Sequence, residues 1–212
     1  MDRYKNTAVN PKSDVFIISQ ALAENQLRRS GVNFFNKEDG VLGNTGKNLE
    51  KFLNRFNRTV YPYQVIRLPN GIVIPKCKSG YISVYNTEIS QCYPGKEGKG
   101  KRDRLPDDQE ITTCLERRFL IREIEFVEPT LLFLMGKASR DSFFKYILNL
   151  HHPPLLSNHI SDIVQTGRFP KFTLNNRSMC VLPIQHASGA NPEFPKMASN
   201  EKLIELIREV LK

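Results

Sequence analysis

Short apolar segments punctuate the chain and predict buried strands. Four of them, at residues 14–19, 81–85, 130–135 and 179–184, are apolar almost throughout instead of alternating with polar residues. Such runs are typical of strands that are buried on both faces of a parallel sheet. Each one leads into a segment of helical or loop character, so we expect helices on both sides of the sheet.

Between and after these strands, apolar residues recur at helical spacing and predict helices. One amphipathic segment follows Gly43, where Asn44 or Thr45 is expected to cap the helix. A longer helix is predicted from about residue 107 to Pro129, and others over residues 138–149 and 200–211. The alternation predicts a three-layer α/β/α sandwich with a central, mainly parallel four-stranded sheet, in a single domain over residues 1–212.

The length and the charge narrow the function classes. A chain of 212 residues is long enough to bury a core without a metal or disulfide. No apolar run approaches the roughly 20 residues of a membrane span, and the start of the chain has no secretion signal, so we expect a cytoplasmic protein. The net charge of +9 favours an anionic partner. Nothing in the sequence calls for a protein partner, and a monomer is expected.

Ligands of open α/β sheets bind beyond the carboxyl ends of the strands, so the segments that follow each strand carry the functional information. After the first strand come SQALA at 19–23, GVNF at 31–34 and GNTG at 43–46. The second strand leads into VYNTEISQCYPG at 84–95, and the fourth into HASG at 186–189. In this order, over nearly the whole chain, the motifs resemble the uracil-DNA glycosylase superfamily, most closely its iron–sulfur branches of bacteria and archaea.

This resemblance implies a monofunctional DNA glycosylase of base-excision repair, a hydrolase that removes a flipped deaminated base, with uracil as the expected base. His186 matches the histidine that donates to the departing base, and Phe34 matches the aromatic residue on which the base stacks. The structural alternatives are a loop or core histidine satisfied by the backbone and a core phenylalanine.

The first motif departs from the resemblance at one position. Ala21 stands where the best-known members carry an aspartate that orients the attacking water. The backbone around Gln20, Ala21 and Leu22 is expected to approach the base or the water. Another group must then hold the water, and the nearest candidates are Gln20 and Glu24.

The largest departure is Glu88, which stands where the family has the asparagine that reads the base. An amide both donates and accepts, whereas an ionised carboxylate only accepts and would repel a uracil carbonyl. Either Glu88 is protonated, or Asn86 reads the base, or the preferred base is another one such as hypoxanthine or xanthine. A solvent-facing glutamate is the structural alternative.

The cysteines argue against a cluster. Cys92 and Cys114 match the third and fourth cluster ligands of the iron–sulfur branch, but the upstream C-x-x-C that supplies the first two is missing. Cys77 would add only a third thiolate, and a cubane needs four ligands. We therefore expect free thiols, with no metal and no cofactor, and Cys180 as a core residue.

Basic residues near these motifs predict the DNA contacts, because backbone phosphates attract cations. Lys96 and Arg104 bound the richest basic segment, and Ala190 is small for the apolar side chain that the family inserts into the base stack. The predicted contacts are Arg28, Arg29, Lys99, Lys101, Arg102, Ser188, Ala190 and Asn191.

Two other functions compete with the glycosylase. One is a DNA-binding relative with weak or no catalysis, suggested by Ala21, Glu88 and Ala187. The other is a flavodoxin-like or nucleoside-hydrolysing enzyme that acts on free nucleotides. No G-x-G-x-x-G or Walker A sequence is present, and the basic charge favours a polymer over a nucleoside.

Overall fold

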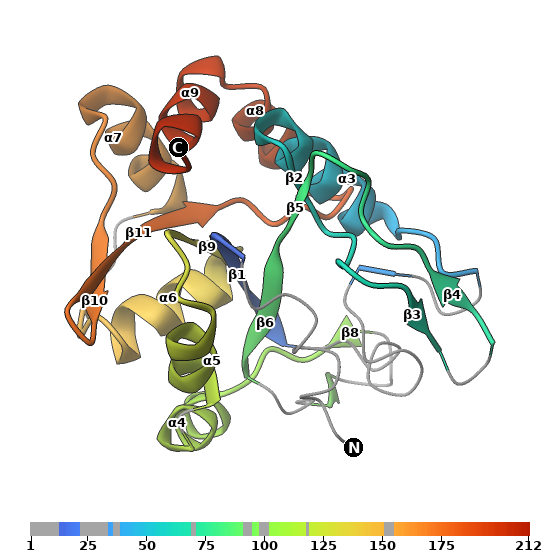
Figure 1. The fold of residues 1–212 in the computed structure, drawn as a ribbon. Coiled ribbons are helices and arrows are strands. Elements are labelled where there is room, and N and C mark those ends of the chain that lie inside the picture. The colour runs from blue at the N-terminus through green and yellow to red at the C-terminus, as the bar shows by residue number, and fades with distance from the viewer. Residues whose placement is uncertain are drawn as a thin grey trace.

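A five-stranded sheet forms the centre of the protein (Figure 1). The computed structural model describes residues 13–21, 34–35, 39–68, 71–90, 95–97, 102–117, 119–150 and 155–212. The strand order is β10-β11-β9-β1-β6, and only β10 runs antiparallel to its neighbour. The strands are β1 (Val15–Ala21), β6 (Tyr85–Ser90), β9 (Leu131–Met135), β10 (Lys171–Leu174) and β11 (Arg177–Ile184).

Helices pack on both faces of this sheet, as predicted. One face is covered by α3 (Asn44–Leu53), the 3-10 turn η1 (Asn54–Phe56), α7 (Leu156–Thr166), α8 (Glu193–Ala198) and α9 (Glu201–Val210). The other face is covered by α4 (Asp108–Glu116), α5 (Phe119–Val127) and α6 (Lys137–Tyr146). None of the helices described combines the length and apolar character that crossing a membrane requires.

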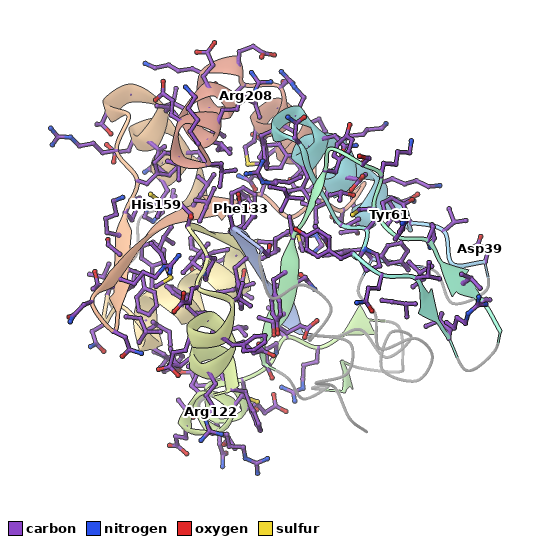
Figure 2. All side chains as sticks on the ribbon, in the orientation of Figure 1. Asp39, Tyr61, Arg122, Phe133, His159 and Arg208 are labelled. Atoms are coloured by element: carbon purple, nitrogen blue, oxygen red, sulfur yellow. The ribbon has the colours of Figure 1, made fainter. Side chains whose placement is uncertain are left out.

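Two-sided burial explains the unbroken apolar runs. Along β1, Ile17 packs in the core cluster on the α3 face and Phe16 packs in the cluster on the opposite face. All five residues of β9 are buried, and Phe133 lies near the middle of the molecule in Figure 2. Because both faces of these strands exclude water, neither face needs polar residues. The predicted α/β class and the mainly parallel sheet are confirmed.

The prediction of four strands was wrong by one. The additional edge strand, β10, alternates between exposed and buried residues and forms a hairpin with β11. Its two-residue turn is Asn175 and Asn176, which both have positive φ, at 49° and 64°. This conformation suits a tight hairpin turn, and asparagine tolerates it better than most residues. The Asn-Asn pair was therefore the signal in the sequence.

The second strand begins later than its apolar run suggested. Residues 82–83 form β5 (Ile82–Ser83), which pairs with β2 (Arg58–Thr59) outside the main sheet. The sheet strand is β6, which pairs with β1 over Tyr85–Ser90. Asn86 and Glu88 therefore lie within a strand and not in the loop beyond it.

Two helix predictions also need correction. Gly43 is the N-cap of α3 and supplies no side-chain cap, so Asn44 and Thr45 do not cap this helix. The predicted long helix is two helices, α4 and α5, of which α4 begins with a capping box between Asp107 and Glu110. Three short strand pairs complete the description: β2 with β5, β3 (Ile66–Arg67) with β4 (Val73–Ile74), and β7 (Lys96–Glu97) with β8 (Arg102–Asp103).

Candidate active site

The candidate site lies at the carboxyl edge of the parallel strands. His186 follows the end of β11 by two residues, and Gly136 directly follows β9. Backbone groups link these two neighbouring strand ends, because the Gly136 N–H donates to the Ile184 carbonyl at 2.9 Å. Ligands of open α/β sheets bind at this edge.

The surroundings of His186 define its protonation. The Ser188 backbone N–H donates to His186 Nδ1 at 3.2 Å, so Nδ1 is an acceptor. In a neutral imidazole the other nitrogen then carries the proton. Burial lowers the pKa of His186 below its ordinary value, because a desolvated imidazolium is unfavourable. His186 is therefore a neutral residue at pH 7 whose Nε2–H is available as a donor.

Gly136 allows the imidazole to pack closely against the main chain. Its φ is +87°, which favours glycine, and it is the N-cap of α6. A Cβ at this position would lie 3.3 Å from His186 Cδ2 and 3.4 Å from His186 Cβ. A side chain here would be strained and would press against the imidazole.

The loop after His186 is held by two asparagines. Asn48 of α3 donates from Nδ2 to the carbonyl oxygen of Ala187 at 3.0 Å, and Ala187 is 0% exposed. Asn191 donates to the His186 carbonyl at 3.1 Å and accepts from the Glu193 N–H at 3.1 Å. The Asn191 side chain thus supports its own loop and the start of α8, while Ser188 is half-buried and Ala190 is exposed.

The same helix, α3, positions Phe34. The Phe34 carbonyl accepts from the Gly43 N–H at 2.8 Å. A Cβ on Gly46 would lie only 2.7 Å from that carbonyl oxygen, so Gly46 lets the helix touch the Phe34 backbone. Phe34 has φ +73°, a conformation that is rare for an aromatic residue and that functional sites often contain. Because Gly46 and Asn48 are two residues apart, α3 brings Phe34 and the His186 loop to the same end of the sheet.

A polar group lies where β1 meets β6. The Ser19 hydroxyl lies 3.3 Å from Asn86 Oδ1 and 3.2 Å from the Thr87 carbonyl oxygen, two acceptors that share its single proton. Ser19 pairs with Glu88 in the β1–β6 register, and strand alternation places Ser19, Asn86 and Glu88 on one face. Asn86 is half-buried and Glu88 is 6% exposed. The alternative of a solvent-facing Glu88 is therefore wrong.

The other predicted site residues are placed only in part. Gln20 is half-buried on β1, and alternation directs it to the face opposite Ser19. Only the backbone is described for Ala21, which ends β1, for Lys96 in β7 and for Arg102 in β8. Arg104 pairs with Glu110 at 2.6 Å. Predicted residues outside the described part of the chain are Leu22, Glu24, Arg28, Arg29, Lys99 and Lys101.

The cysteines are spread over separate elements. Cys114 of α4 is buried with its Sγ 3.9 Å from Ser90 Oγ, Cys180 is buried in β11, and Cys77 is half-buried. Cys92 lies outside the described residues. Within the described ranges, no three His, Cys, Asp or Glu side chains come together in a way that would hold a metal ion. The described residues do not fit a cluster, and no chemistry is assigned to one.

Several residues that shape the site were not predicted from the sequence, although two of them left a signal in it. Gly136 was detectable as a glycine directly after a buried strand, and Ser19 as a polar residue at the end of another. Asn48 gave no signal, because its partner is 139 positions away. A hollow of about 400 Å³ beside α4 is lined by none of the predicted site residues, and we assign the chemistry to the strand ends, where the donors converge.

The candidate site suits a planar ring that forms hydrogen bonds through its edge. It offers an imidazole donor, an aromatic side chain and an amide next to a carboxylate. The protein is thus of the α/β class, with its candidate site at the carboxyl ends of the parallel strands. The chain matches the family model of the Uracil DNA glycosylase superfamily over residues 7–212, and it belongs to that superfamily. No curated protein sequence matches the chain. Membership indicates a DNA glycosylase, a hydrolase of base-excision repair that acts on DNA.

Proposed function

We propose that this protein is a monofunctional glycosylase that hydrolyses the N-glycosidic bond of a flipped deaminated base in DNA, with uracil as the first candidate. The observation that carries the proposal is the state of His186. Its Nδ1 accepts from the Ser188 N–H and burial disfavours its charged form, so a neutral Nε2–H is the donor at the strand ends.

The reaction needs this donor when the bond breaks. As the bond between the sugar C1′ and the base nitrogen opens, its electron pair leaves with the base and negative charge develops on a ring carbonyl oxygen. A donor fixed in advance stabilises that charge mainly in the transition state. The water oxygen then bonds to C1′ and loses a proton, which neutralises the released base anion. Gln20 and Glu24 are the proposed groups that orient this water. Stacking on Phe34 would add about 1 to 3 kcal/mol.

Asn86 and Glu88 fit the edge that deaminated bases share. Because the Ser19 hydroxyl donates to Asn86 Oδ1, the Asn86 amino group is the part of the amide left to donate to a base. Glu88, on the same strand face, accepts when ionised. Uracil, hypoxanthine and xanthine each present a carbonyl beside a ring N–H, which complements this donor and acceptor. Cytosine and adenine present an amino group beside a ring acceptor, and the pairing would be reversed.

The remaining parts of the proposal concern the DNA and the cell. Phosphate contacts by the basic residues predicted from the sequence would hold the strand, and Ala190 is exposed on the loop next to His186. A single domain that acts as a monomer in the cytoplasm, without a cofactor, completes the proposal.

The test is incubation with oligonucleotides that carry uracil, hypoxanthine or xanthine, followed by alkaline cleavage of abasic sites. We expect cleavage at uracil, and no cleavage of an otherwise identical strand with cytosine. A protein that binds these strands but releases no base would instead be the inactive DNA-binding relative, which is favoured by Ala21 in place of the family's aspartate.

A further inference from the structure

A β-hairpin extends from the body beside α3. It comprises β3 and β4, paired through Ile66 with Ile74 and Arg67 with Val73 (Figure 1). Its turn is closed by hydrogen bonds from the Leu68 N–H to the Ile72 carbonyl and from the Gly71 N–H to the Leu68 carbonyl. At the base of the hairpin, a hydrogen bond of 2.7 Å from the Cys77 N–H to the Pro62 carbonyl joins the segment that leads into the hairpin to the segment that leaves it.

The hairpin is attached firmly to the segment that carries Phe34. Leu68 and Ile74 are buried in the core cluster that also contains Phe35 and Leu42. Tyr61, at the base of the hairpin, packs edge-on against Phe35 with ring centroids 5.4 Å apart (Figure 2). The hairpin is therefore held in a fixed position beside the proposed stacking residue.

Close backbone contact strengthens this attachment. A Cβ on Gly40 would lie 2.7 Å from Ile72 Cγ2 and 3.0 Å from the Val73 carbonyl oxygen. Gly40 has φ +68°, so glycine is favoured here for its conformation as well as for the lack of space. The segment before α3 and strand β4 are therefore in close backbone contact at Gly40.

The hairpin and the segments that flank it carry exposed cations and exposed valines. Residues 60–87 include Arg67, Lys76 and Lys78 but no aspartate or glutamate. These three cations are exposed, and none forms an ion pair with any residue that the structure describes. Val65 and Val73 are 48% and 40% exposed.

Some charged residues elsewhere in the described part of the chain form ion pairs. Arg55 pairs with Glu201, and Arg177 pairs with Glu128. The Asp39 carboxylate, which lies at the outer end of the hairpin in Figure 2, accepts from the Val41 N–H at 2.9 Å. Within the described residues, no ion pair offsets the positive charge of Arg67, Lys76 and Lys78.

We infer that the β3–β4 hairpin is a second DNA-binding surface, which contacts backbone phosphates of the duplex beside the flipped nucleotide. The choice of DNA as the partner rests on the proposed function, but the hairpin surface lies outside the candidate active site. Phosphates match the exposed cations, and a two-stranded ribbon has dimensions that a DNA groove admits. The exposed valines would lie against the sugars between the phosphate contacts.

The experiment compares two triple variants of the full chain. The hairpin variant carries Arg67→Ala, Lys76→Ala and Lys78→Ala. The control carries Arg168→Ala, Lys202→Ala and Lys212→Ala, which remove the same charge from exposed positions around α7 and α9, far from the hairpin in Figure 1. Affinity for undamaged duplex DNA is measured over a range of salt concentrations, so the readout does not require base excision.

We expect the hairpin variant to bind DNA at least about ten-fold more weakly near 0.1 M salt. In a plot of log affinity against log salt concentration, the magnitude of its slope should be smaller by about two to three. The control should stay close to the unmodified protein. Equal affinities and slopes for the two variants would overturn the inference, and a cationic hairpin that serves an acidic protein partner would give this same result. Failure to excise any base would count against the proposed function but not against this surface.

Discussion

The two ends of the candidate site are built in different ways. At the β11 end, the contacts act on the main chain of the His186 loop. The Ser188 N–H donates to His186, Gly136 leaves room for the imidazole, and the Asn48 and Asn191 side chains bind the Ala187 and His186 carbonyls. At the β6 end, side chains of strand residues contact one another, as in the hydrogen bond from Ser19 to Asn86.

This difference separates two tasks. A donor aimed at developing charge must be placed within a few tenths of an ångström, and a backbone framework supplies that rigidity. A hydrogen-bonding edge for a base can change when one side chain in a formed strand is exchanged. We therefore expect substitutions at the β11 end to lower the rate for every base, and substitutions at the β6 end to change which base is preferred.

The largest expected effect is at His186. His186→Ala should lower single-turnover excision by about 10²-fold or more, because the lost donor acts mainly in the transition state. DNA affinity should change little, and an electrophoretic binding assay checks this. His159→Ala is a matched control, since His159 is also buried but lies on α7 against Phe144. Equal rates in His186→Ala and the unmodified protein would give His186 a structural role.

The next effect tests the β6 end through Glu88. Glu88→Asn should raise uracil excision relative to hypoxanthine. Uracil has carbonyls on both sides of its ring N–H, so one oxygen of an ionised Glu88 accepts from that N–H while the other faces a carbonyl, where an amide would present a donor instead. The change in preference should reach up to a few kcal/mol, the cost of a buried polar group without a matching partner. Competition between uracil and hypoxanthine strands measures it, and Glu88→Gln keeps the side-chain length. Unchanged preference in both variants would transfer base reading to Asn86 or to a main-chain group.

Asn48 tests whether the His186 loop depends on α3. Asn48→Ala leaves the buried Ala187 carbonyl without its donor, which costs about 1 to 3 kcal/mol. We expect a lower unfolding temperature and a roughly ten-fold slower excision of every base alike. Lys51→Ala, on the exposed side of the same helix, should change neither. A change in base preference in Asn48→Ala would contradict the division between the two ends.

A smaller effect is expected at Ser19. Ser19→Ala removes the donor to Asn86 Oδ1 and lets the amide rotate, so discrimination between uracil and cytosine should fall by about 0.5 to 1.5 kcal/mol, which is roughly two- to thirteen-fold. The rate on uracil itself should change less than the ratio. Ser19→Thr, which keeps the hydroxyl, should restore much of the discrimination. Loss of rate without loss of discrimination would place Ser19 outside base reading.

The smallest effect on the excision rate is expected for a change of pH near neutrality. Burial lowers the pKa of His186, so the residue stays neutral from pH 8 down to its ordinary pKa of about 6.5, and excision should be constant over that range. At lower pH a proton on Nδ1 would face the Ser188 N–H, and both activity and stability should fall, since the unfolded chain binds the proton more readily. Single-turnover rates and unfolding curves from pH 5 to 8 check this, and a rate that rises towards pH 5 would require a protonated donor.

The sequence by itself was sufficient to predict the strands that are buried on both faces. Residues 14–19, 130–135 and 179–184 are apolar because both of their faces are covered, and the composition of a strand records this directly. The order of the motifs after these strands was likewise sufficient to identify the superfamily and to place His186 next to β11.

Only the tertiary structure decided the rest of the site. β6 contains Asn86, Thr87 and Glu88, so its polarity hid a strand that is formed by pairing with β1. Glu88 is 6% exposed although it is a charged residue type, and Asn48 reaches a carbonyl group 139 positions away. Local propensity cannot encode such contacts, because their free energy arises only when the packed sheet brings the two partners together.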